Sequence, residues 1–117
     1  MKIVTIYGIK NCDSVKKAIK YLKFKNLDYN LIDFKETPIS REKIEYWINQ
    51  LNVDKLFNKR STTYRNLKLK ELNLDRDGQI EWLSKENLLI KRPVIEYEDK
   101  IIVGFDQSSY DNFFESK

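Results

Sequence analysis

The sequence of 117 residues contains no histidine and a single cysteine, Cys12. The absence of histidine excludes Ser-His-Asp and Cys-His catalysis, zinc ligation by histidine and a histidine pH switch. A single cysteine excludes an internal disulfide, which fits a reducing compartment. Any catalysis by this chain must therefore use the one thiol, carboxylates, lysines, arginines or hydroxyl groups.

Glycine and proline are also scarce, with three and two residues, while 41% of the chain is apolar and 34% is charged. This mixture indicates a globular protein rather than a disordered one. No apolar run approaches the roughly 18 residues of a membrane span, and the strip at residues 1–7 is too short for a signal-peptide core. We expect a single domain over residues 1–117. We also expect a cytoplasmic monomer with no bound metal and no membrane association.

Charge is distributed unevenly along the chain. Residues 1–60 carry 13 lysines and arginines against 7 acidic residues, whereas residues 61–117 carry 9 against 11. A basic first half that contains the cysteine suits an anionic substrate, and a solvated lysine-rich surface explains the same counts.

The first 34 residues predict a strand, a helix and a second strand. Residues 2–7 are β-branched and aromatic and end at Gly8, as a buried strand does. From position 13 or 14 the apolar residues follow a helical period, with Asn26 as the expected C-cap. Residues 28–34 predict the second strand. A strand–helix–strand unit of this length implies a parallel pair with a right-handed crossover.

The rest of the chain predicts a second helix, a helical segment, a hairpin and a last helix. Ser40 is a suitable N-cap for the second helix. Residues 52–90 contain no convincing strand and suggest short helices, with a turn at residues 75–78. Residues 94–97 and 100–103 read as a hairpin, and Asp106 as the cap of a last helix. The order is β-α-β-α, a helical insertion at about residues 40–90, then β-β-α, which is an α/β class.

Cys12 follows a strand-ending loop and directly precedes an amphipathic helix. The free N–H groups and the dipole at a helix N-terminus stabilise an anion, including a thiolate nucleophile. The neighbouring Lys10 acts in the same direction. A free cysteine is also commonly a small buried apolar residue, although the polar loop around Cys12 favours the reactive interpretation.

The spacing around Cys12 limits the thiol chemistry. A dithiol redox motif needs a second cysteine at position 15, which is Val15. Because the chain cannot resolve its own mixed disulfide, turnover requires an external thiol, and glutathione is the obvious candidate.

Four ordered segments resemble the YffB branch of the ArsC/Spx family. They are YGIKNCDSVKKA at residues 7–18, NKRSTTYR at 58–65, IKRPV at 90–94 and VGFD at 103–106. The resemblance covers essentially the whole chain. It implies a thioredoxin-like fold with a helical insertion between the second and third strands, in agreement with the pattern read from the residues.

The resemblance also implies an activity and a site. It implies a glutathione-dependent thiol reductase with no bound cofactor, glutathione as co-substrate and glutaredoxin as a candidate partner. Cys12 is then the nucleophile, and Arg92 and Arg60 hold an oxyanion, for which the planar guanidinium is suited. Pro93 is expected to follow a cis bond and to face the thiol. The remaining residues expected to bind substrate or glutathione are Lys10, Asn11, Asp13 and Ser14.

One departure from the family pattern concerns the substrate. Arsenate reductases place a third arginine shortly after the last strand, where this chain has Gly104, Phe105, Asp106 and Gln107. A carboxylate at this place disfavours arsenate.

Three other functions stay open. One is a genuine arsenate reductase, another is an Spx-like regulator that binds RNA polymerase, and the third is a relic of the fold that is kept only as a binding module. Spx-type sensing uses a Cys-x-x-Cys pair, which Val15 removes. Direct nucleic-acid binding is not expected, because no helix combines basic residues with a recognition pattern.

Overall fold

The computed structural model describes residues 3–115. The chain forms two compact units, which we call unit 1 (residues 1–37 and 92–117) and unit 2 (residues 38–91). Within the described residues, no helix is both long enough and apolar enough to cross a membrane.

Unit 1 is built on a four-stranded sheet. The strands are β1 (Val4–Gly8), β2 (Tyr29–Asp33), β3 (Val94–Tyr97) and β4 (Lys100–Val103), in the order β2-β1-β3-β4. β1 and β2 are parallel, and β3 is antiparallel to both β1 and β4. The parallel pair and the hairpin are therefore as predicted. The ends of β1 and β2 differ by one or two residues from the predicted ranges 2–7 and 28–34, and Lys2 lies outside the described residues.

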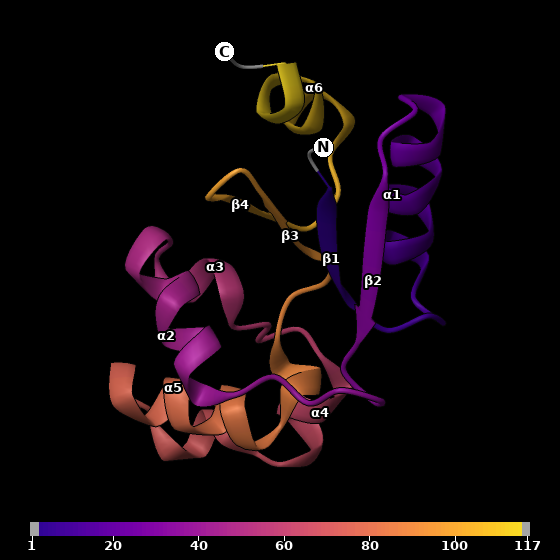
Figure 1. The fold of residues 1–117 in the computed structure, drawn as a ribbon. Helices are drawn as coiled ribbons and strands as arrows, with labels where there is room; N and C mark the ends of the chain where they lie inside the picture. The colour runs from indigo at the N-terminus through magenta and orange to yellow at the C-terminus, as the bar shows by residue number, and fades with distance from the viewer. Residues whose placement is uncertain (1–2, 116–117) are drawn as a thin grey trace. The chain divides into compact units, whose positions relative to one another are not determined.

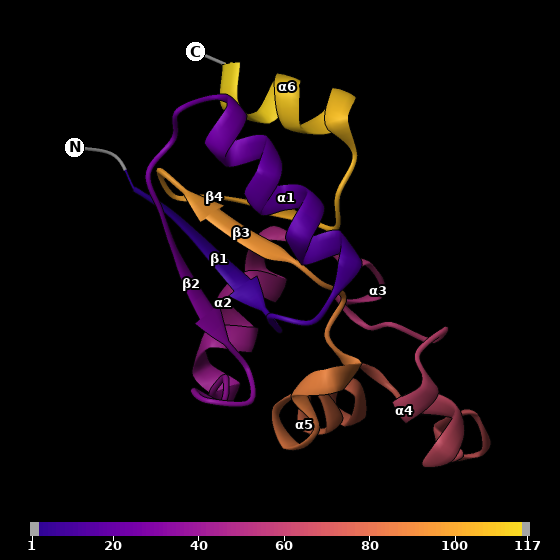
Figure 2. The same cartoon turned by 90° about the vertical axis from the view of Figure 1, so that its right-hand side faces the viewer.

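Two helices cover one face of this sheet, α1 (Asp13–Phe24) and α6 (Gln107–Glu115). Figure 2 shows α1 lying across the strands, with α6 beside its C-terminal half. The expected C-cap is wrong by one residue, because Lys25 caps α1 and Asn26 follows in a left-handed conformation. Apolar side chains from strands and helices form the core between the layers: Val4, Ile6, Val15, Ala18, Tyr21, Leu22, Ile95 and Tyr110.

An aromatic cluster joins α6 to α1. The fully buried Tyr110 ring lies edge-on to Tyr21 at 5.3 Å and to Phe105 at 4.9 Å between centroids. The Tyr110 hydroxyl donates to the carbonyl of Gly104, and burial raises the pKa of this phenol. Asp106 caps α6 as predicted, since its Oδ2 accepts from the backbone N–H of Ser109 at 2.9 Å. These contacts fix the segment that follows the last strand.

Unit 2 is built of short helices and occupies the chain between β2 and β3 (Figure 1). Ser40 caps the first helix as predicted, accepting from Lys43 N at 3.2 Å. The predicted turn at residues 75–78 is wrong: Asp75 is an N-cap, and its Oδ1 accepts from Gly78 N within the first helical turn. The helices are α2 (Arg41–Gln50), α3 (Val53–Leu56), α4 (Thr62–Asn66), η1 (Leu69–Leu72), α5 (Arg76–Lys85) and η2 (Asn87–Leu89).

Unit 2 has its own core around the fully buried Trp47. An isolated antiparallel bridge between Phe57 and Ile90 ties the middle of the unit to its end. The side chain of Asn87 accepts from Ile39 N at 2.8 Å and donates to the Leu83 carbonyl at 2.9 Å. The sheet order and the helical segment between β2 and β3 give the chain the predicted thioredoxin-like fold.

Candidate active site

Cys12 is the N-cap residue of α1 and is half-buried. Its backbone is extended, with φ −128° and ψ 127°, and its carbonyl accepts from Lys16 N at 3.0 Å. Within the described part of the chain, its side chain makes no capping hydrogen bond. The first N–H groups of α1 are therefore not used by this side chain, and free N–H groups at a helix N-terminus stabilise negative charge close to them.

Gly8 is the point where the start of α1 and the start of β3 meet. A Cβ built on Gly8 would lie 2.6 Å from Cγ2 of Val15 and 3.9 Å from Cβ of Arg92. The missing side chain lets the first turn of α1 pack directly on the end of β1. The structure thus brings the helix that carries Cys12 and the predicted site residue Arg92 to the same backbone position.

The Arg92–Pro93 peptide bond is cis, as predicted. β1 and β3 pair with Tyr7 opposite Val94, so the antiparallel register continues with Pro93 beside Gly8. Pro93 is buried, and its carbonyl accepts from Gly104 N at 2.8 Å. The cis proline therefore lies at the end of β1 from which the Cys12 loop departs.

Asp33, at the end of β2, holds the Cys12 loop by its backbone. One carboxylate oxygen accepts from Lys10 N at 2.9 Å and the other from Lys35 N at 2.8 Å. The Gly8 carbonyl accepts from Phe34 N at 2.8 Å, which extends the parallel pairing to the loop. The side chain is buried, with 7% exposure. The N–H of Lys10, followed by that of Lys35, lowers the pKa of this carboxyl below 3.8.

The other predicted binding residues of unit 1 line the loop and the first helical turn. Lys10, Asn11 and Asp13 are exposed, and Ser14 is half-buried. The ammonium group of Lys10 pairs with Glu36 at 3.1 Å. The position of these residues next to Cys12 is established, and their contact with a substrate stays a prediction.

Arg60 belongs to unit 2, where it precedes α4. Its backbone N–H donates to Oδ1 of Asn58 at 3.0 Å, and it lines a cavity of about 320 Å³ with Lys59 and Lys91. The role of Arg60 beside Cys12 stays a prediction.

Gly8 and Asp33 are site residues that the sequence analysis did not identify. A signal for Asp33 was present, because the carboxyl ends of two parallel strands lie at the same sheet edge, so an acidic residue ending β2 lies beside the loop that follows β1. Gly8 had no comparable signal, since its importance comes from the approach of Val15.

Substitution Gly8→Ala is expected to destabilise the chain by about 1–3 kcal/mol through overpacking. The new methyl would collide with Val15, whose β-branched side chain has little rotamer freedom. Urea unfolding of Gly8→Ala, Val15→Ala and the double variant measures the coupling. The cost of Gly8→Ala should be much smaller in the Val15→Ala background. Equal costs in the two backgrounds would contradict the proposed contact.

Comparison with known proteins gives a consistent result. Residues 7–113 match the ArsC family. An uncharacterized protein of Haemophilus influenzae (strain ATCC 51907 / DSM 11121 / KW20 / Rd) is 39% identical over 113 residues, covering 96% of this chain and 99% of that protein. The solved structure of a YffB protein superposes with a TM-score of 0.86 at 33% identity, covering 92% of this chain and 95% of the other.

The chain is also similar, at lower sequence identity, to transcription regulators. The global transcriptional regulator Spx of Listeria innocua (serovar 6a, strain ATCC BAA-680 / CLIP 11262) is 25% identical over 113 residues, covering 95% of this chain and 86% of that protein.

Proposed function

The chain belongs to the ArsC family and to its YffB branch, and from this premise we propose that it is a glutathione-dependent monothiol reductase. The observation that carries the proposal is the position of its only thiol. Cys12 lies at the N-terminus of α1, at the sheet edge where the cis Arg92–Pro93 bond begins β3. This edge combines a nucleophile, helix N–H groups and a guanidinium side chain.

The proposed reaction is reduction of a disulfide between glutathione and a second thiol compound. The Cys12 thiolate attacks the glutathione sulfur, so that a Cys12–glutathione disulfide forms and the second compound leaves as its thiolate. A molecule of reduced glutathione then attacks the glutathione sulfur on Cys12. Oxidised glutathione leaves, and the Cys12 thiolate is regenerated. In total, one reduced glutathione is consumed, the second compound is released as a thiol, and one molecule of oxidised glutathione forms.

Each residue of the site has a proposed role in this reaction. The guanidinium groups of Arg92 and Arg60 bind the anionic part of the substrate. Lys10, Asn11, Asp13 and Ser14 form the loop and helix turn against which glutathione lies. Pro93 fixes the backbone at the start of β3 beside the Cys12 loop. Glutaredoxin is an alternative electron donor in place of the second glutathione.

The test begins with the mass of the protein after treatment with oxidised glutathione. The wild-type chain should gain one glutathione, reduced glutathione should remove it, and Cys12→Ser should gain none. Turnover is then measured as oxidised glutathione produced from the mixed disulfide of glutathione and 2-mercaptoethanol. Cys12→Ser should reduce turnover to the uncatalysed rate. A wild-type chain that gains no glutathione, or equal turnover by the two proteins, contradicts the proposal.

The similarity to Spx favours a regulator that binds RNA polymerase as the second candidate. A Cys-x-x-Cys switch would need a second cysteine at position 15. This chain has Val15 there, which is fully buried and packs on Gly8. A regulator of this kind would act without a cysteine pair. Co-purification of polymerase subunits with the wild-type and Cys12→Ser chains alike, together with absent turnover, would support this candidate over the reductase.

A further inference from the structure

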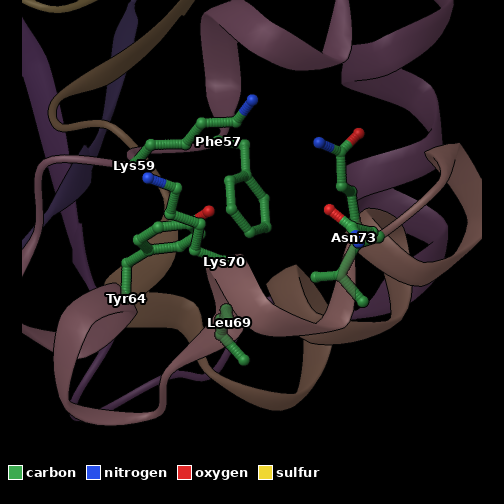
Figure 3. Close-up of a pocket in the computed structure, with 8 residues that line it drawn as sticks. Phe57, Lys59, Tyr64, Leu69, Lys70 and Asn73 are labelled. Carbon is green, nitrogen blue, oxygen red and sulfur yellow. The ribbon is translucent and has the colours of Figure 1, made fainter.

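A cavity of about 540 Å³ lies within unit 2 and contains none of the residues assigned to the candidate active site. Its volume is in the range of small-molecule sites. Figure 3 shows Lys59, Lys70 and Tyr64 on one side, Asn73 on the other, and the Phe57 ring between them. The lining combines apolar and polar side chains: Phe57, Lys59, Tyr64, Leu69, Lys70, Asn73, Leu74 and Gln79.

The charge of this cavity is positive. Lys59 and Lys70 contribute two ammonium groups, and no acidic residue lines the cavity. Among residues 3–115, neither lysine forms an ion pair within 4.0 Å. Two ammonium groups at one concave surface favour an anion, which they can bind by charge-assisted hydrogen bonds.

Gln79 provides a buried polar group at the same cavity. The residue as a whole is only 9% exposed. In the described part of the chain its amide makes no hydrogen bond, while its backbone N–H donates to the Asp75 carbonyl at 2.9 Å. The amide atoms are not fully enclosed by protein, so they are open to a partner that enters the cavity. A ligand in the cavity can supply the partner that the protein does not.

The remaining lining is apolar and partly aromatic. Phe57 and Leu69 are 2% and 1% exposed, so both are held in place by the core of unit 2. The rings of Phe57 and Tyr64 lie edge-to-face, with centroids 5.7 Å apart and an interplanar angle of 88°. The apolar surface that is open to the cavity therefore comes from the half-buried Tyr64 and Leu74, and it suits a flat apolar group rather than a fully hydrated ion.

We propose that this cavity binds a small aromatic anion, a carboxylate or a phosphate ester. Its ring lies against Tyr64 and Leu74, its anionic group meets Lys59 and Lys70, and the Gln79 amide donates to one of its oxygens. This site is independent of the thiol chemistry at Cys12 and stands whether or not the protein reduces disulfides.

The binding test is a titration of the full-length, isotope-labelled chain with phenyl phosphate, followed by backbone amide NMR. Saturable shifts should centre on the segments that line the cavity, between residues 57 and 79. Benzyl alcohol, which keeps the ring without the charge, and benzylamine, which reverses the charge, should bind at least tenfold more weakly. Shifts centred elsewhere, or equal binding of benzyl alcohol, overturn the proposal.

Variants separate a binding role from a structural one. The double variant Lys59→Gln/Lys70→Gln should weaken phenyl phosphate binding by at least about tenfold, the value of one charge-assisted contact. Lys55→Gln removes an exposed lysine of unit 2 that does not line the cavity, and it should bind as wild type does. Gln79→Leu should weaken binding while leaving the unfolding midpoint equal or higher, because no protein partner loses a hydrogen bond. Unchanged affinity in the double variant would falsify the proposal.

Discussion

Substitution Asp33→Ala is expected to lower the free energy of unfolding by about 2–4 kcal/mol at neutral pH. It removes the acceptors of two charge-assisted hydrogen bonds, from Lys10 N and Lys35 N. Asp33→Asn keeps one acceptor, so it should cost about half as much. Urea unfolding gives these values, and hydrogen exchange at the Lys10 amide should accelerate in both variants. Asp28→Ala changes an exposed aspartate that precedes the same strand, and it should be nearly neutral.

The contribution of Asp33 should also depend on pH, with a defined sign. Because the backbone N–H of Lys10 holds the pKa of the folded carboxyl below 3.8, its ordinary value, the charged form is favoured by folding. This stability is fully present above that ordinary value and is lost as the pH falls through the folded pKa. The difference in unfolding free energy between wild type and Asp33→Asn should be flat from neutral pH down to about 4 and then decrease. An increase of the difference on acidification would show that another group is responsible.

Arsenate turnover by the wild-type chain should be roughly 30- to 1,000-fold lower than that of a genuine arsenate reductase. This range is the usual loss for one positioned charge-assisted contact in the transition state. Arsenate reductases of the family place a third arginine shortly after the last strand, where residues 104–107 of this chain include no lysine or arginine. Asp106 is there instead, and the N–H and hydroxyl groups of Ser109 lower its pKa, so its carboxyl is charged at neutral pH.

The measurement is the specificity constant for arsenate with saturating glutathione and glutaredoxin, with a genuine arsenate reductase assayed in parallel. Cys12→Ser gives the background, and the glutathione adduct of the wild-type chain shows that its thiol is active. Equal constants for the two enzymes would mean that this chain does not need the third arginine. Introducing that arginine is not simple here. At position 105 it would remove a ring from the aromatic cluster of Tyr21 and Tyr110, and at position 106 it would remove the cap of α6.

The fold was predictable where a local pattern determines it. The apolar period of α1 and the β-branched strands are properties of neighbouring residues, and so are the caps at Ser40 and Asp106. The prediction of a turn at residues 75–78 was wrong for a physical reason. Aspartate and glycine favour turns, but an aspartate carboxylate can equally cap a helix. Asp75 takes the second role, because Ile80 and Leu83 further along α5 are buried in the core of unit 2.

The site was predictable only in part. Cys12 and the Arg92–Pro93 pair each lie in a short sequence segment that is recognisable by itself. Gly8 acts through its close approach to Val15, which lies 7 positions further along the chain, and Asp33 accepts a hydrogen bond from Lys10, 23 positions before it. No local sequence pattern specifies either contact. The anion cavity of unit 2 arises in the same way, from the approach of η1 and α5 to Phe57.

The two units differ in their chromophores as well as in their cores. Both tryptophans of the chain, the buried Trp47 and the partly exposed Trp82, lie in unit 2, whereas the aromatic cluster of unit 1 contains tyrosine and phenylalanine only. Selective excitation of indole fluorescence therefore reports on unit 2, and the second-derivative absorbance of tyrosine reports mainly on unit 1, which contains five of the seven tyrosines. One denaturation experiment read by both signals shows whether the inserted helices melt together with the sheet or separately.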